Sequence, residues 1–259
     1  GCMIIVMKKS NVILVGLIFA LLLAIYSLNM NTDTQASATG ADEDAVSGGR
    51  QRTVIVDAGH GGEDPGKVSN FSDLKEKDLN LKIALKLKQL LEDADYKVIM
   101  TREDDRLVYS EGTTNIYNKR LQDLTRRKDI MDNSGADIVV SIHMNKFASP
   151  LPKGLQVWYS KNNERSKLLA EYIRKKNVEL VQPDNTRDIK PATSAIYLMH
   201  RATAPAVTVE CGFLSNHEEA ALLETKEYRD KLAAMLLGAI AEYHNNVPAD
   251  DHAEPPQQN

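Results

Sequence analysis

Three residues that can bind a metal or transfer a proton each follow a short apolar run. His60 comes directly after "TVIVDAG", His143 ends "ADIVVSIH", and Glu210 ends "AVTVE". Either histidine alone is more simply explained as a turn or capping residue. A carboxylate at the end of a buried strand is harder to explain, because it needs a partner or a metal. Together the three residues indicate one site for metal-dependent or acid–base chemistry.

Two histidines and a carboxylate are a common ligand set for hydrolytic zinc, with a water as the fourth ligand. The missing ligand should follow the glycine-rich loop after His60, where Glu76 and Asp78 begin a predicted helix. Acidic residues in a first helical turn also stabilise the helix dipole by ~0.3–1 kcal/mol, so the residues alone do not choose between these two. Glu210 is then expected to act as the general base.

The elements that must position these residues alternate along the chain. Apolar runs predict strands over residues 53–57, 97–100, 136–142, 155–160, 195–199 and 206–210. Amphipathic spacing predicts helices over residues 78–94, 121–135, 163–180, 217–224 and 228–244. This order indicates a single α/β domain with a mostly parallel central sheet and helices on both faces. Because ligands bind beyond the carboxyl ends of parallel strands, the three residues are expected to meet at one edge of the sheet.

Composition indicates how the chain is divided into domains. The 259 residues are 42% hydrophobic and carry a formal net charge of −4, so no strongly basic surface indicates nucleic-acid binding. Residues 29–52 are polar and small, which is typical of a flexible spacer. We expect a leader over residues 1–38, a spacer over 39–51, a catalytic domain over 52–246 and a disordered tail over 247–259.

The leader carries Lys8 and Lys9 before an uncharged apolar run over residues 12–28. The run is short for a membrane-spanning helix and long for a signal-peptide core, so a cleaved signal and a retained anchor both remain possible. "ASA" at residues 36–38 would serve as a cleavage site. Either way the protein is expected to be exported and to act at the membrane or in the cell wall.

Five segments, in this order and spacing, resemble one enzyme family. "VIVDAGHGGEDPG", "LKEKDLNL", "MTREDD", "ADIVVSIHMN" and "PAVTVECGFLSN" are similar to motifs of the zinc-dependent N-acetylmuramoyl-L-alanine amidases, the amidase 3 family. Within that family the chain resembles the amidases of the spore cortex and of germination in spore-forming bacteria. The resemblance spans residues 52–246.

The resemblance implies specific roles. His60, Glu76 and His143 would bind one zinc ion and Glu210 would be the catalytic glutamate, which leaves Asp78 as a helix cap. Asp57 is expected to orient His60 or to be a structural acid near it. The substrate would be the glycan strand of peptidoglycan with its stem peptide. In the spore cortex, a deacetylase partner would complete muramic-δ-lactam formation, an activating lipoprotein is a further expected partner, and the compartment would be the spore intermembrane space.

The roles of three arginines and of Cys211 are less clearly indicated by the sequence. Arg102 is expected to pair with Asp104 or Asp57 or to bind substrate, whereas Arg126 and Arg127 compete for one family position in a segment where "MDNSG" departs from the "AN" of many relatives. Cys211 is expected to be a small core residue on the face opposite Glu210.

Two other functions compete with the amidase interpretation. A zinc carboxypeptidase acting on stem peptides also combines two histidines with a glutamate, but the placement of the first histidine within "GHGG" and of Glu76 sixteen residues later disfavours it. A non-catalytic protein that binds peptidoglycan on an amidase scaffold is the second alternative. The presence of all four inferred site residues argues against it.

Overall fold

The computed structural model describes residues 50–248. The predicted leader and nearly all of the predicted spacer and tail lie outside these residues. Within the described part of the chain, no helix is both long enough and apolar enough to cross a membrane.

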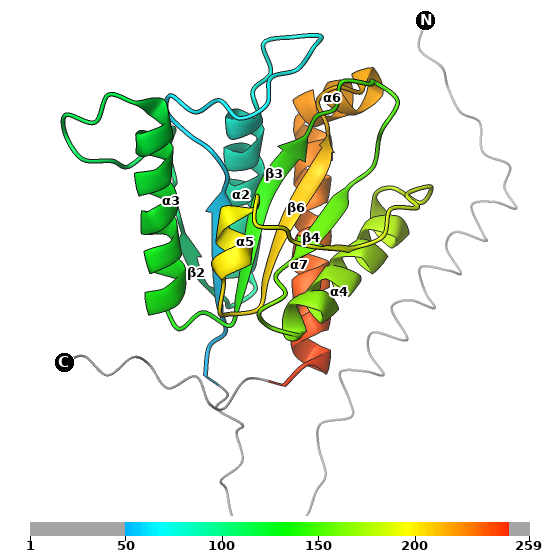
Figure 1. Ribbon diagram of the computed structural model, residues 1–259. Helices are drawn as coiled ribbons and strands as arrows, with labels where there is room; N and C mark the ends of the chain where they lie inside the picture. The colour runs from blue at the N-terminus through cyan, green and yellow to red at the C-terminus, as the bar shows by residue number, and fades with distance from the viewer. Residues whose placement is uncertain (1–49, 249–259) are drawn as a thin grey trace, which may run out of the picture. The chain divides into compact units, whose positions relative to one another are not determined.

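The described residues form one six-stranded sheet in the order β2-β1-β3-β6-β4-β5 (Figure 1). The strands are β1 (Thr53–Ala58), β2 (Lys97–Met100), β3 (Ile138–Asn145), β4 (Gln156–Tyr159), β5 (Lys190–Pro191) and β6 (Ala206–Phe213). All neighbouring pairs are parallel except β4 and β6, which are antiparallel. The prediction of a single α/β domain with a mostly parallel sheet is confirmed.

Helices cover both faces of this sheet. The longer ones are α2 (Glu76–Asp93), α3 (Ile116–Asn133), α4 (Arg165–Leu180) and α7 (Lys226–Asn246), and the shorter ones are α5 (Tyr197–Arg201) and α6 (His217–Glu224). The main core lies between the sheet and α2, α4 and α7. A smaller core lies on the other face, under α3 and α5. Figure 1 shows α5 in front of the sheet and α2 and α7 behind it.

Side chains of β3 alternate between these two faces, as a strand requires. Ile138, Val140, Ile142 and Met144 are buried in the main core. The residues between them face α3 and α5, and they become polar toward the carboxyl end of the strand, where His143 lies. The face with the thinner helical cover therefore carries the polar residues.

One predicted strand is wrong. Residues 195–199 were expected to form a strand, but α5 begins at Tyr197 within them. A short apolar run does not distinguish a strand from a turn of helix. Here β6 is already paired with β3 on one side and β4 on the other, so no strand can add beside it. Leu198 and Met199 instead pack into the smaller core.

Two further differences concern element ends. Helix α3 begins at Ile116, before the predicted start at residue 121, because the Asn115 side chain accepts hydrogen bonds from the backbone N–H groups of Tyr117 and Asn118. The two-residue strand β5 lies in a segment without an apolar pattern, and the sequence did not predict it.

Candidate active site

The structure brings His60, Glu76 and His143 together in one cluster. One ligand atom from each residue lies within 4.8 Å of the others. Glu76 Oε1 is 3.3 Å from His60 Nε2 and 2.9 Å from His143 Nδ1. Tetrahedral zinc with bonds of about 2.0–2.2 Å separates its ligand atoms by about 3.3 Å. The chemistry and spacing of these three groups therefore fit one zinc ion.

Glu76 is the first residue of α2 and is fully buried. Its Oε1 accepts a hydrogen bond of 3.0 Å from the backbone N–H of Met144, and its Oε2 accepts one of 2.7 Å from the backbone N–H of Lys67. Burial raises the pKa of this carboxyl, but hydrogen bonds with His143 and His60 hold it well below its usual range. Glu76 is therefore a fixed, ionised carboxylate whose oxygen can bind a metal.

Asp78 does not cap α2, so this prediction is wrong. The capping position is Lys75, whose side chain makes no capping hydrogen bond. Asp78 lies within the first turn, two residues after Glu76. The chain enters the helix from the glycine-rich loop, and the backbone N–H of Glu76 is satisfied by the carbonyl oxygen of Lys67 at 2.8 Å.

His60 lies in a tight turn, with a left-handed φ of 62° that is uncommon outside glycine. Gly61 and Asp64 exchange two backbone hydrogen bonds, which brings Asp64 back toward His60. Asp64 Oδ2 is 2.6 Å from His60 Nδ1, so His60 Nε2 is left to face Glu76. Burial lowers the pKa of His60, but Asp64 and Glu76 raise it to about 9.

Asp57 was expected to be the orienter of His60 or a structural acid near it, and only the second role is found. It is fully buried and accepts hydrogen bonds from Thr101 Oγ1, Ser141 Oγ and Arg127 Nη1. Burial raises the pKa of Asp57, but the Arg127 guanidinium brings it down to about 2. Sequence reasoning missed Asp64, although its place four residues after His60 in a glycine-rich turn was the available signal.

Two glycines allow the cluster to close. A Cβ on Gly59 would lie 2.2 Å from His143 Cε1. A Cβ on Gly66, which also has a left-handed φ of 64°, would lie 2.7 Å from both Glu76 Oε2 and His60 Cδ2. The side chains of the cluster therefore fill the space that other residues would need at these two positions.

Glu210 lies beside the cluster. It is the register partner of His143 on the neighbouring parallel strand, so both side chains are on the same face of the sheet. Its Oε2 is buried and has no hydrogen-bond partner among the described residues, and Lys67 Nζ lies 3.8 Å away. Burial raises the pKa of Glu210, and Lys67 opposes the rise. A buried carboxylate oxygen without a partner has room to accept a hydrogen bond from a water or a substrate.

Arg126 and Arg127, whose roles the sequence left open, both donate hydrogen bonds within the protein. Arg127 is 2% exposed, pairs with Asp57 and Asp123, and donates to the carbonyl oxygens of Ala58 and His60. Arg126 donates to a carbonyl oxygen, that of Thr101.

Among the described residues Arg102 makes no ion pair with the carboxylate of Asp104 or Asp57, but it donates a hydrogen bond of 2.9 Å to the backbone carbonyl oxygen of Asp104, so the expected pairing is found only in that form. Its guanidinium donates to four backbone carbonyl oxygens, including those of Ala58 and Gly59. The Asn80 amide donates to the same Gly59 oxygen at 3.0 Å. Together Arg102 and Asn80 fix the backbone that leads into His60. The expectation for Cys211 is confirmed, because this residue is buried in the main core, on the face opposite Glu210.

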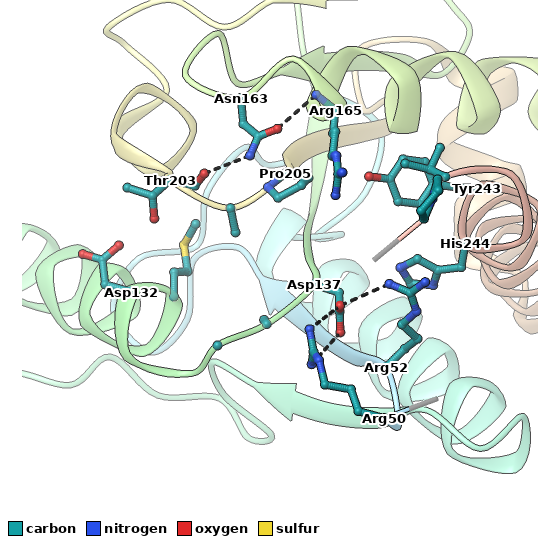
Figure 2. Close-up of a pocket in the computed structure, with 16 residues that line it drawn as sticks. Arg50, Arg52, Asp132, Asp137, Asn163, Arg165, Thr203, Pro205, Tyr243 and His244 are labelled. Atoms are coloured by element: carbon teal, nitrogen blue, oxygen red, sulfur yellow. Dashed lines mark hydrogen bonds and ion pairs between the residues drawn. The ribbon is translucent and has the colours of Figure 1, made fainter. Parts of the chain in front are cut away.

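A cavity of about 350 Å³ lies at the end of the sheet away from the cluster, where β1, β3 and β6 begin (Figure 2). Asp137 accepts hydrogen bonds there from the backbone N–H of Thr53 and from the side chains of Arg50 and Arg52. His244 also lines this cavity. None of the cluster residues does, so this cavity is separate from the cluster, which lies near the carboxyl ends of the strands, where parallel sheets usually bind ligands.

Comparisons with known proteins identify the family of the chain. Residues 54–242 match the Amidase_3 family model, described as N-acetylmuramoyl-L-alanine amidase. The chain belongs to the N-acetylmuramoyl-L-alanine amidase family. It is 35% identical over 195 residues to the germination-specific N-acetylmuramoyl-L-alanine amidase of Bacillus subtilis, an alignment that covers 74% of this chain and 79% of that protein.

Solved structures of amidases share the fold. The CwlD amidase of Clostridioides difficile, solved in complex with the GerS lipoprotein, is 40% identical with a TM-score of 0.72, covering 74% of this chain and 98% of that one. The catalytic domain of CwlV from Bacillus (Paenibacillus) polymyxa is 28% identical with a TM-score of 0.63, covering 75% and 99%. This amidase therefore hydrolyses the bond between N-acetylmuramic acid and L-alanine of peptidoglycan and acts outside the cytoplasm.

Proposed function

We propose that the amidase is a zinc hydrolase in which His60, Glu76 and His143 bind the metal and Glu210 is the general base. The observation that carries this proposal is the convergence of two imidazole nitrogens and a carboxylate oxygen on one point, within 4.8 Å of one another. The partnerless oxygen of Glu210 beside them supports the second part. Histidine and carboxylate donors in this number are typical of catalytic zinc.

When bound, zinc would polarise the scissile carbonyl and lower the pKa of a water to ~7. Glu210 takes the proton of the attacking water and later delivers it to the departing nitrogen of L-alanine. Lys67, with Nζ 2.7 Å from the carbonyl oxygen of Met144, keeps a positive charge beside Glu210 and Glu76. The Asp64 carboxylate holds His60 in one orientation throughout, as partners of metal ligands commonly do.

A direct experiment tests this assignment. Full-length protein is stripped with a chelator, assayed on purified peptidoglycan, and assayed again after zinc is restored. We expect release of peptides that begin with L-alanine to cease and then to return. Mass spectrometry of the products separates the alternatives, because a carboxypeptidase would leave muramic acid attached to its peptide. Activity that survives complete removal of the metal would contradict the proposal.

We further propose that the amidase acts in the spore cortex, in the spore intermembrane space, where removal of stem peptides precedes muramic-δ-lactam formation by a deacetylase partner. The similarity to a germination-specific amidase and to the CwlD amidase supports this role. Because CwlD was solved with a lipoprotein, we also propose a lipoprotein partner for this chain. Deleting the gene should remove muramic-δ-lactam from the cortex, and a cortex of normal lactam content would rule the role out.

A further inference from the structure

A second pocket, of about 250 Å³, opens directly beside the metal cluster. His60 and His143 line it on one side, and α3 and α5 close it on the other. Three leucines, Leu107, Leu124 and Leu198, contribute apolar surface. Because the pocket shares both histidines with the cluster, it is open to one of the two parts of a substrate cleaved there, the glycan arm or the peptide arm.

Two arginines, Arg120 and Arg127, line this pocket together with three aspartates, Asp57, Asp64 and Asp123. The two arginines differ in what they can offer a ligand. Arg127 is buried, and its donors are used by Asp57, Asp123 and backbone carbonyl oxygens. The Arg120 side chain is 44% exposed, and its one hydrogen-bonded partner among the described residues is Asp64, reached through Nη2. A guanidinium has five N–H donors, so Arg120 keeps donors for a further acceptor.

The two arms of the substrate differ in charge. On the glycan side, the lactyl carboxyl is consumed in the scissile amide and the neighbouring sugars are neutral. On the peptide side, L-alanine is followed by an acidic residue that is linked through its side-chain carboxyl and so keeps a free α-carboxylate. Arginine binds carboxylates through paired, charge-assisted hydrogen bonds. A pocket with an available arginine therefore matches the peptide arm.

We propose that Arg120 is a specificity-determining residue that binds the free α-carboxylate of the acidic second residue of the stem peptide, with the leucine-lined pocket holding the peptide arm. This inference rests on the metal cluster being the cleavage site. Two successive hydrogen bonds, through Asp64, connect Arg120 to His60, so the guanidinium lies within about 10 Å of the cluster. Two extended residues span about 7 Å, a length comparable with this distance.

The test uses two synthetic muramyl peptides that differ only in the second residue, which is D-glutamate in one and D-isoglutamine in the other. For the wild-type enzyme we expect kcat/KM to be about 10- to 100-fold higher with the acid, the usual effect of a hydrogen bond to a charged group. Arg120→Gln should lose this factor on the acid and retain its activity on the amide, so that the ratio falls to about 1. Arg120→Lys should recover part of it.

Arg120 also touches Asp64, so a purely structural role must be separated from substrate binding. A structural role would lower kcat/KM equally for the acid and the amide and would weaken zinc binding measured by calorimetry. That result, or a wild-type ratio near 1, would overturn the proposal. Lys119→Gln is the matched control, because Lys119 is the neighbouring cation but pairs with Glu63 and Tyr109. The ratio of kcat/KM for the acid to kcat/KM for the amide should be the same in Lys119→Gln as in wild type.

Failure of the zinc-hydrolase assignment would give a different result. The zinc-loaded wild-type enzyme would then hydrolyse neither peptide. In that case, calorimetry still decides whether Arg120 binds the carboxylate. It measures the affinities of the wild-type and Arg120→Gln proteins for the two uncleaved peptides. Equal affinity of the wild-type protein for the acid and the amide would refute it.

Discussion

His143 and Glu210 are register partners on the adjacent parallel strands β3 and β6, so an inferred metal ligand and the inferred base are held by the sheet itself. Neither side chain depends on a loop for its position relative to the other. This rigidity makes the two residues separable by mutation, because a change of side chain at one need not displace the other.

Glu210→Gln keeps the shape of the side chain but cannot accept a proton. We expect zinc affinity and thermal stability close to wild type, with kcat reduced by about 10²–10⁴-fold, the usual contribution of a general base. Calorimetry with zinc and assays on peptidoglycan measure the two effects. Full turnover in this variant would show that another group is the base.

Asp64→Asn replaces the hydrogen-bond acceptor beside His60 Nδ1 with an amide. Because that partner fixes the ring so that Nε2 faces Glu76, we expect zinc affinity of the apoprotein to fall by about 10- to 100-fold. Glu63→Gln, a change at the neighbouring carboxylate that pairs with Lys119, should leave the affinity unchanged. Equal affinities for Asp64→Asn and wild type would remove Asp64 from the metal site.

Gly59→Ala places a methyl group where the His143 ring now lies, 2.2 Å from Cε1. The ring must move, and we expect at least a tenfold loss of zinc affinity, about the effect of overpacking by one methyl group. In Gly238→Ala, by contrast, the added methyl group meets no atom within 4 Å, and the helix should gain about 0.5–1 kcal/mol of stability. Tight zinc binding by Gly59→Ala would mean that the loop adjusts without moving the ring.

His244 gives the stability of the fold a dependence on pH that is separate from catalysis. Burial, and then the nearby Arg52, lower its pKa from 6.5 to about 4, whereas Asp137 acts in the opposite direction. Between pH 6.5 and 4 the unfolded chain therefore binds more protons at this position than the folded protein. The contribution of neutral His244 to stability is complete above pH 6.5 and is lost as the pH falls through this range.

His244→Phe tests this dependence, because it keeps a ring to stack on Tyr96 but cannot take up a proton. We expect Tm to fall less steeply between pH 6.5 and 4 in the variant than in wild type, with the two curves parallel above pH 7. Differential scanning calorimetry measures both. Identical slopes would show that other groups, such as buried carboxyls, dominate the acid sensitivity.

The sequence predicted most of the sheet because its strands are continuous apolar runs, and it predicted the meeting of His60, His143 and Glu210 because parallel strands place their ends at one edge. It could not choose between Glu76 and Asp78 without the family resemblance, since both belong to the first turn of a helix. The structure brings Glu76 to the histidines because the backbone N–H groups of Lys67 and Met144 hold its carboxylate. The metal and catalytic roles themselves remain predictions.

Other features depend on contacts that no local pattern reveals. The run at residues 195–199 is as apolar as a strand, and only the pairing of β6 on both sides forces it to become helix α5. Asp64 comes to His60 only through the left-handed turn at residues 60–62. Arg120 lies on the exposed side of α3, where a charged residue carries no signal until the pocket beside it is seen.

The alternation along β3 has a consequence for how this enzyme can change over time. Substitutions at Val140 or Met144 alter the packing of the core and should change stability, whereas we expect substitutions at His143, next to Met144, to change activity. Deletion of a single residue within the strand would exchange the two sets, burying the polar residues and exposing the apolar ones. Neighbouring residues of one strand are thus expected to be under two different kinds of selection, one for stability and one for activity. The length of the strand is constrained by both.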